Sequence, residues 1–187
     1  QRLLVVASVI WKSKQNVVRC MGVTRMNKAF VFDFDDTLAK TDCKVLVRSE
    51  FNNSVLYRLT PSEYNTFELL DGWFYDYSQF SDAQYIREGE STFLMDLAKE
   101  VHDENHDVYI LTARGNAIAD SIDAFLKDHG IEAKQIHCVG DSDGSIAKEK
   151  SKILLAIMQG YNRVYFYDDD KTNVETAKEI GVKSYQV

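Results

Sequence analysis

The stretch "AFVFDFDDTL", Ala29–Leu38, decides the fold class and points to the chemistry. An apolar run enters Asp33, and Asp35 and Asp36 follow within three positions. Such a run is typical of a strand buried on both faces, which we expect over Ala29–Phe34. Carboxylates packed this closely repel one another unless a cation or hydrogen-bond donors hold them. The sequence therefore predicts a buried strand that ends in a site for positive charge.

Strand and helix patterns alternate from this stretch to the C-terminus. Further strands are predicted at 107–113, 135–140, 163–168 and 183–187, and amphipathic helices at 91–105, 115–130, 147–160 and 172–181. Ser91 is the expected N-cap of the first of these helices, and Gly130 ends the second. Single helices between strands imply right-handed crossovers and a parallel sheet covered on both faces. The predicted fold class is α/β, a three-layer sandwich with a Rossmann-like parallel sheet.

Acidic and polar residues stand where three of the predicted strands end. Asp33, Thr112 and Asp168 each close a strand, and the run "DDD" continues to Asp170. In open parallel sheets, ligands bind beyond the carboxyl ends of the strands. Magnesium prefers oxygen ligands and takes a few carboxylates together with water and a substrate phosphate. The sequence therefore predicts a Mg²⁺ site that can receive a phosphate group.

Composition excludes several classes of protein. The 187 residues suit one domain, and 45% hydrophobic residues allow a full core. A formal net charge of −7 argues against broad binding to nucleic acid or anionic lipid, although a local basic patch stays open. Three cysteines without a Cys-x-x-Cys spacing are typical of reduced thiols in a cytoplasmic protein and make a zinc site improbable.

Two segments fall outside the alternation. Residues 1–25 are expected to be an upstream extension without a functional role, with Met26 as the natural start. Within it, Leu3–Trp11 is too short to span a membrane, and no Ala-x-Ala cleavage site follows. Residues 41–90 are expected to be a small insertion after the first strand that covers the site. Its aromatic run, Gly72–Phe80, is either the core of that insertion or a base-stacking platform.

The motifs resemble those of the haloacid dehalogenase (HAD) superfamily. "DFDDTL" is similar to its first motif, Asp-x-Asp-x-Thr-[Leu/Val]. "YILTAR", "AKEKSKIL" and "VYFYDDDKTNVETA" are similar to the second, third and fourth motifs, in the family's order. The resemblance covers Ala29–Val187 and implies a HAD-like phosphatase domain over residues 26–187, with a small cap at about 41–90. Asp36 stands where many members have glycine.

The resemblance implies a role for each motif residue. Asp33 would attack phosphorus and form an aspartyl-phosphate, and Asp35 would act as general acid and base. Thr112 and Lys150 would hold the phosphoryl oxygens and offset the charge of the reacting anions. Mg²⁺ would be bound by Asp33, by Asp169 and by the backbone carbonyl of Asp35. The presence of Asp35 argues against a dehalogenase.

Three assignments stay open on the sequence. Lys150 is preferred as the third-motif lysine because Ile153 and Leu154 follow it by three and four positions, and Lys148 is the alternative. Asp169 is preferred as the metal ligand, which leaves Asp168 as an alternative ligand or a supporting residue. Arg114 either contacts the substrate phosphate or pairs with the acidic edge.

The resulting functional hypothesis is a magnesium-dependent phosphomonoesterase that is not tied to a membrane. The Asp-Asp-Thr of the first motif and the Arg114 that closes the second are similar to the phosphatase half of phage-type polynucleotide kinase–phosphatases. They imply a nucleotide or a nucleic-acid 3′-phosphate as substrate. The alternatives are a small-metabolite phosphatase, a phosphomutase, or a non-catalytic protein that binds phosphate. The sequence does not indicate an oligomeric state.

Overall fold

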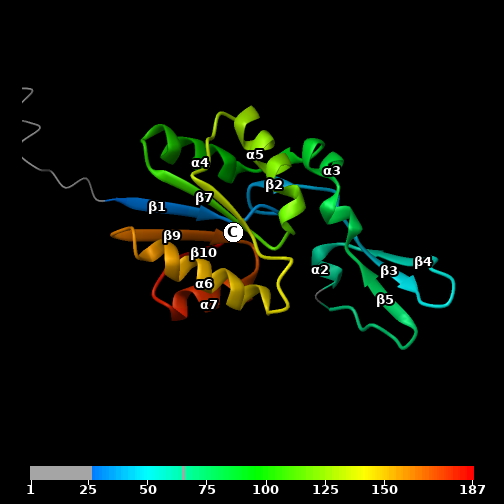
Figure 1. Cartoon of the computed structure of the whole chain (residues 1–187). Helices are drawn as coiled ribbons and strands as arrows, with labels where there is room; N and C mark the ends of the chain where they lie inside the picture. Colours follow the sequence, from blue (N-terminus) through cyan, green and yellow to red (C-terminus); the bar gives the residue numbers. More distant parts are fainter. Residues whose placement is uncertain (1–26, 65) are drawn as a thin grey trace, which may run out of the picture.

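A computed structural model describes residues 27–64 and 66–187 (Figure 1). The extension predicted over residues 1–25, together with Met26 and Cys20, lies outside the described residues. No helix within the described ranges is long and apolar enough to cross a bilayer.

Five parallel strands form the central sheet, in the order β10-β9-β1-β7-β8. The strands are β1 (Lys28–Phe32), β7 (Asp107–Thr112), β8 (Gln135–Cys138), β9 (Arg163–Asp168) and β10 (Lys183–Gln186). β1 lies in the middle, where Ala29, Val31 and Phe32 are fully buried. This position explains its continuous apolar run, because a central strand of a covered parallel sheet contacts apolar side chains on both faces.

Helices cover both faces of the sheet, which confirms the predicted three-layer α/β sandwich (Figure 1). α4 (Phe93–Asp103) and α5 (Ala119–Asp128) pack on one face, and α6 (Ile146–Met158) and α7 (Lys171–Glu179) on the other. Strand side chains alternate between the two cores: Phe30 and Phe32 belong to the first, and Ala29 and Val31 to the second.

Three predicted boundaries are corrected by the structure. β1 ends at Phe32 because the chain turns, and the Phe34 carbonyl then accepts from the backbone N–H groups of Leu38 and Ala39. The N-cap of α4 is Thr92 rather than Ser91, since the Thr92 hydroxyl accepts from the Leu94 N–H at 3.2 Å. The helix predicted from residue 115 starts with a 3-10 turn, η2 (Asn116–Ile118), before α5 begins.

The segment between β1 and α4 forms a small structure beyond the carboxyl ends of the strands (Figure 1). β3 (Val45–Ser49), β4 (Val55–Leu59) and β5 (Trp73–Asp76) make an antiparallel sheet in the order β4-β3-β5. It is accompanied by the short helices α2 (Pro61–Tyr64), η1 (Ser78–Ser81) and α3 (Ala83–Arg87). β2 (Ala39–Lys40) and β6 (Glu90–Ser91) pair antiparallel where the inserted segment begins and ends. β3 begins with three buried residues and β4 is mostly exposed, so neither strand shows the regular alternation of a half-buried strand. The segment therefore did not fit the predicted pattern of alternating strands and helices.

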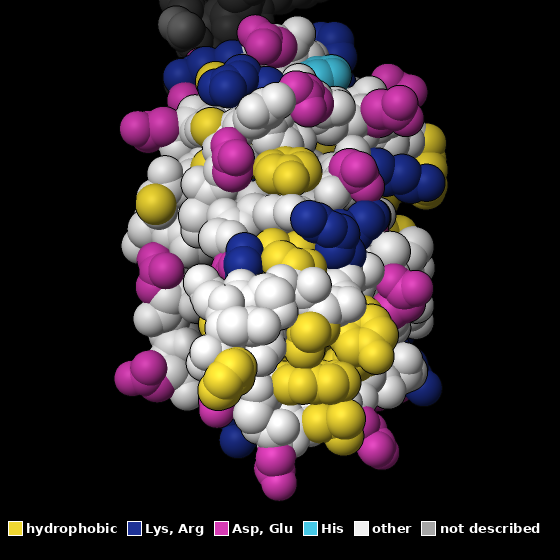
Figure 2. Space-filling view, turned by 90° about the vertical axis from the view of Figure 1, so that its right-hand side faces the viewer, with side chains coloured by type: hydrophobic (Ala, Val, Ile, Leu, Met, Phe, Trp, Pro, Cys, Tyr) yellow, Lys and Arg dark blue, Asp and Glu magenta, His cyan; other side chains and the backbone are white. Residues whose placement is uncertain are grey.

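The aromatic run packs mainly inside this insertion. Trp73, Tyr75 and Phe80 contact a small apolar core that contains Val45 and Val47. Figure 2 faces this end of the molecule and shows hydrophobic side chains gathered on its lower part. The exposed large hydrophobic residues of the insertion include Phe51, Leu56, Tyr57, Leu69, Leu70 and Tyr77. Of the two interpretations of the run, the core interpretation therefore describes most of its rings.

Candidate active site

The ends of β1, β7 and β9 bring the predicted polar residues to one place. Asp33 directly follows β1, Thr112 is the last residue of β7, and Asp168 is the last residue of β9. All three are nearly inaccessible, with exposed fractions of 6%, 1% and 0%. Buried polar groups need partners, so the site must supply charge and hydrogen bonds from within.

Lys150 supplies that charge from the second turn of α6. Its Nζ donates to Asp33 Oδ1 and to Asp168 Oδ2, both at 2.7 Å. The helix places Lys150 inward because it shares a face with the buried Ala147, Leu154 and Ile157. Burial opposes its charge, but Asp33 and Asp168 together raise the pKa of Lys150, so the amine is protonated. Lys148 is exposed, and the geometry favours Lys150 as the motif lysine.

The cluster holds two buried carboxyl groups and one ammonium. Burial raises the pKa of Asp33, and Asp168 adds to this effect while Lys150 opposes it. Asp168 is also held by the Asn173 amide, whose Nδ2 lies 3.1 Å from both carboxylate oxygens. Asp168 is therefore held by two donors, Lys150 and Asn173, and the site has more carboxyl groups than ammonium groups.

Asp169 brings a third carboxylate to the same point. One carboxylate oxygen each of Asp33, Asp168 and Asp169 lies within 4.8 Å of the other two. An all-oxygen donor set with excess negative charge fits Mg²⁺. Burial raises the pKa of Asp169 to about 6, and the carboxylates of Asp168 and Asp36 add to the shift. Burial and the neighbouring carboxylates thus destabilise the ionised form of Asp169, and a bound cation would stabilise it.

We expect Asp169→Asn to raise the melting temperature of the metal-free protein at pH 7.5. The raised pKa means that ionised Asp169 costs folding free energy above pH 6, and this cost disappears below about pH 4. The gain should therefore vanish in acid. Mg²⁺ should raise the melting temperature of the wild type and have little effect on the variant. Thermal unfolding with and without Mg²⁺ at both pH values tests this, and a variant less stable than the wild type at pH 7.5 would contradict it.

Asp35 is held by Arg114 across the mouth of the site. Arg114 Nε donates to Asp35 Oδ2 and Nη2 donates to Asp35 Oδ1, both at 2.7 Å. The Arg114 side chain is only 1% exposed, while that of Asp35 is 22% exposed. Of the two roles considered for Arg114, this geometry shows the ion pair with the acidic edge. A contact with substrate stays a prediction.

The same guanidinium ties the site to the insertion. Arg114 Nη1 donates to the Phe80 carbonyl at 2.7 Å, and Nη2 lies 3.0 Å from Thr41 Oγ1 and 3.3 Å from Cys43 Sγ. The Thr41 hydroxyl in turn donates to Asp35 Oδ1 at 2.7 Å. Sequence reasoning missed Thr41, Cys43 and Phe80, since no spacing connects them to a residue that lies 34 to 73 positions away.

We expect Arg114→Lys to lower kcat of the proposed hydrolysis by about 10²-fold and to leave KM nearly unchanged. A lysine cannot make the two-pronged contact, so Asp35 loses its fixed position, and small displacements of a reacting group cost this much. Arg87→Lys, on the exposed surface of α3, is the matched control. A rise in KM at constant kcat would instead assign Arg114 to substrate binding.

Two backbone features shape the loops of the site. Asp36 has a φ of +55°, a left-handed conformation that favours glycine and is tolerated by aspartate. Aspartate can therefore occupy this position, where the resembled motif often has glycine. Gly140 follows β8, and a Cβ there would lie 2.1 Å from the Ala113 carbonyl. The loop that carries Arg114 therefore needs glycine beside it.

The two cysteines within the described ranges form no disulfide with each other. Cys43 is buried and Cys138 is partly buried, and both are free. Burial raises the pKa of Cys138 to about 11, so this thiol is protonated and unreactive at neutral pH.

We compared the chain with known protein families, sequences and solved structures. No protein-family model and no curated protein sequence matches the chain. Among solved structures, a Pnkp1/Rnl/Hen1 RNA repair complex matches with a TM-score of 0.56 at 17% identity, covering 88% of this chain and 43% of that chain. A HAD-superfamily hydrolase of subfamily IA from Geobacter sulfurreducens matches with a TM-score of 0.55 at 12% identity, covering 86% and 89%. A haloacid dehalogenase-like hydrolase from Streptococcus pneumoniae matches with a TM-score of 0.51 at 15% identity, covering 86% and 84%.

These likenesses establish a HAD-like fold for the chain. This chain spans less than half of the length of the chain matched in the repair complex. At such low identity the comparison concerns the arrangement of strands and helices, and the chemistry has to be argued from the site itself.

Proposed function

We propose that this chain is a magnesium-dependent phosphomonoesterase that works through an aspartyl-phosphate. The observation that carries the proposal is the buried Lys150, which bridges Asp33 and Asp168 beside Asp169. A structural ion pair would need only one carboxylate for the ammonium. Three carboxylates beside one ammonium can also bind a further cation. Burying these charged groups costs folding free energy. Buried ionisable clusters of this kind are typical of active sites.

In the proposed first step, a carboxylate oxygen of Asp33 attacks phosphorus. The new bond joins Asp33 to the phosphoryl group, and the bond from phosphorus to the ester oxygen breaks. Asp35, two residues further along, enters this step as the protonated acid and gives its proton to the leaving alkoxide; it regains a proton in the second step. Lys150 and the Thr112 hydroxyl hold the phosphoryl oxygens and offset the approach of two anions.

In the second step, water hydrolyses the acyl phosphate. Asp35 takes a proton from the attacking water, the phosphorus–oxygen bond to Asp33 breaks, and inorganic phosphate leaves. Arg114 holds Asp35 at both carboxylate oxygens and thereby limits where this proton transfer can take place. Asp35 thus acts as the acid in the first step and as the base in the second.

The carboxylates fit Mg²⁺, and we assign the metal to Asp33 and Asp169, with Asp168 close enough to be a ligand as well. The backbone carbonyl of Asp35 is the further ligand implied by the resemblance. When bound, the ion would neutralise the cluster and polarise the phosphoryl group.

For the substrate we propose a nucleotide or a nucleic-acid 3′-phosphate. Two arguments support this: the similarity to phage-type polynucleotide kinase–phosphatases, and the likeness of the fold to a chain of an RNA repair complex. We take residues 41–90 to be a small cap that leaves room for a bulky substrate. The net charge of −7 weighs against tight binding of long polynucleotides. A small-metabolite phosphatase or phosphomutase is the second candidate.

A substrate panel tests the proposal. We expect release of inorganic phosphate from para-nitrophenyl phosphate only with Mg²⁺, and higher kcat/KM for a 3′-phosphorylated oligonucleotide than for sugar phosphates. A preference for sugar phosphates would replace the substrate assignment and keep the reaction class. Phosphate binding without release from any member would instead support a non-catalytic phosphate-binding protein.

A further inference from the structure

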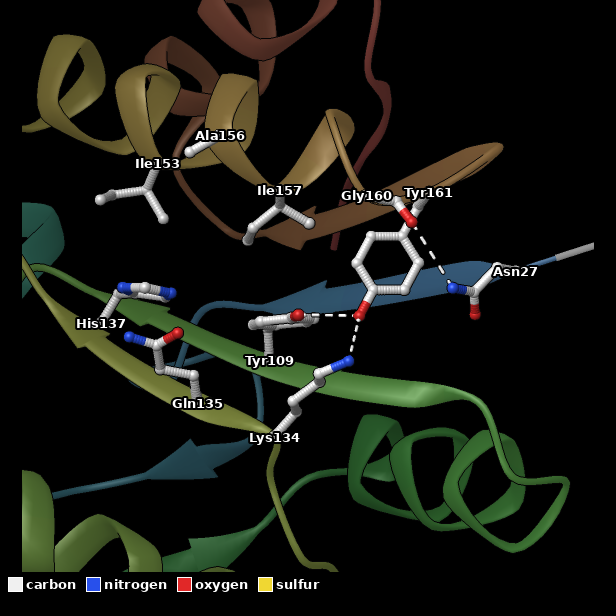
Figure 3. A pocket seen from close by; sticks show the side chains of 10 residues that line it. All are labelled: Asn27, Tyr109, Lys134, Gln135, His137, Ile153, Ala156, Ile157, Gly160 and Tyr161. Atoms are coloured by element: carbon white, nitrogen blue, oxygen red, sulfur yellow. Dashed lines mark hydrogen bonds between the residues drawn. The ribbon is translucent and has the colours of Figure 1, made fainter.

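A cavity lies away from the acidic site, between α6 and the strands β7 and β8 (Figure 3). It has a volume of about 370 Å³, within the range of small-ligand sites. Its lining includes Asn27, which precedes β1, and Tyr161, which precedes β9. The cavity therefore lies toward the amino ends of the strands, whereas the acidic cluster lies at their carboxyl ends. A ligand here would not reach Asp33.

Two aromatic rings form the floor of this cavity, which we call the slot; His137 offers the more accessible ring, because Tyr109 is only 7% exposed. The rings of Tyr109 and His137 are nearly parallel, with an interplanar angle of 13° and centroids 6.2 Å apart. Ile153 and Ile157 of α6 face them from the opposite side (Figure 3). Burial lowers the pKa of His137, so the ring is neutral at pH 7. An aromatic floor under an aliphatic roof favours a planar ring as the occupant.

Polar groups gather at one end of the slot (Figure 3). Tyr161 gives its only hydroxyl proton to Asp107 at 2.6 Å, so at 2.8 Å the Tyr109 hydroxyl must be the donor to Tyr161. Lys134 donates to Asp107 at 2.9 Å and to Tyr161 at 2.8 Å. These contacts use two of the three N–H groups of Lys134 and leave the Tyr109 oxygen able to accept. The Gln135 amide, which lies beside His137 rather than in this group, adds one more donor and acceptor (Figure 3).

The charge at this end is balanced. Lys134 forms an ion pair with Asp107, so the group attracts neither an anion nor a cation strongly. Alternating donors and acceptors around a neutral stacking floor match the edge and face of a nucleobase, which proteins read by hydrogen bonds and stacking. A phosphate group would find no unpaired positive charge among the lining residues.

We propose that this slot is a binding site for a neutral heteroaromatic ring of the nucleobase class, separate from the acidic site. The base can belong to a free nucleoside or to an unpaired position of an oligonucleotide. The proposal does not depend on the phosphatase assignment, because no residue of the slot belongs to the reacting cluster.

The test follows adenosine, cytidine and a short oligonucleotide by NMR of protein labelled at the isoleucine methyl groups. We expect the methyl signals of Ile153 and Ile157 to shift on titration, and cyclohexanol, a non-planar ring, to leave them in place. Ala156→Trp fills the slot from an exposed position and should weaken binding at least tenfold. Leu155→Trp, the exposed neighbour on α6, should leave binding unchanged. Both variants should keep the wild-type melting temperature and phosphatase rate.

Several outcomes would overturn the proposal. The first is the absence of shifts up to the solubility limit of both nucleosides and for the oligonucleotide. The second is binding that survives in Ala156→Trp or that inorganic phosphate displaces, since either places the ligand elsewhere. The third is a wild-type dimer that dissociates in Ala156→Trp, which would make the slot an interface between copies of the chain. Binding by the oligonucleotide alone would retain the site and assign it to polynucleotides.

Discussion

Asp33→Asn is expected to lower kcat by at least about 10⁴-fold with every phosphate ester the wild type hydrolyses. An amide oxygen is a poor nucleophile, and the covalent step cannot be bypassed by the other residues of the site. The fold should be retained because Lys150 keeps its second partner, Asp168, at 2.7 Å. Steady-state kinetics with Mg²⁺ present gives the rate, and acid quenching with radiolabelled substrate gives the phosphorylated protein. No label should be trapped on the variant.

The matched control for this substitution is Asp36→Asn. Asp36 is exposed, three residues further along, and its φ of +55° is a conformation that asparagine tolerates well. We expect this variant to keep most of the wild-type rate. If Asp33→Asn and Asp36→Asn lost activity equally, or if Asp33→Asn stayed active, the aspartyl-phosphate mechanism would be wrong.

Lys150→Met has the second largest expected effect, and it acts on both rate and stability. Removing the ammonium leaves Asp33 and Asp168 buried and unneutralised, and breaking a buried pair in this way costs about 3–5 kcal/mol of unfolding free energy. Catalysis should also fall by at least about 10²-fold because a donor to the reacting anion is lost. Chemical denaturation of the metal-free protein at pH 7.5 measures the first effect, and kcat in saturating Mg²⁺ measures the second.

The matched control is Lys148→Met, on the exposed side of the same helix. Lysine and methionine have similar helix propensities, so this change should alter stability by no more than a few tenths of a kcal/mol. The stability lost in Lys150→Met should shrink on going to pH 5, because burial raises the pKa of Asp33 and its protonation removes the repulsion between the two groups. A loss that is the same for both variants, or that grows toward pH 5, would contradict the role given to Lys150.

The apolar pattern of the chain was sufficient to predict the sheet and its two covering layers. β1 is a continuous apolar run that Asp33 directly follows, and β9 is an alternating apolar run that ends in Asp168. Parallel connectivity brings the carboxyl ends of both strands to one edge of the sheet. The i+3 and i+4 spacing after Lys150 favoured it and left Lys148 as the alternative. The structure places Lys150 on the buried face of α6, as helix geometry predicts from that spacing.

Element boundaries and the insertion were less predictable. Thr92 rather than Ser91 caps α4 because Ser91 is paired with Ala39 in a short bridge, a contact between segments 52 residues apart. The β3–β5 sheet has partly exposed strands of four or five residues, and so short a pattern does not stand out from a loop in sequence. The register of its antiparallel strands depends on which strands pair with one another, and this pairing is not visible in the sequence.

Sequence by itself therefore determined the layers of this protein, the strand ends that carry Asp33, Thr112 and Asp168, and the inward lysine, because these follow from local periodicity and parallel topology. Tertiary structure alone decided that Arg114 clamps Asp35 and reaches the Phe80 carbonyl, and that Tyr109 and His137 form the floor of a slot under α6. The physical reason is that a long side chain or a cross-strand ring pair finds its partner by packing in three dimensions, and no spacing along the chain records that choice.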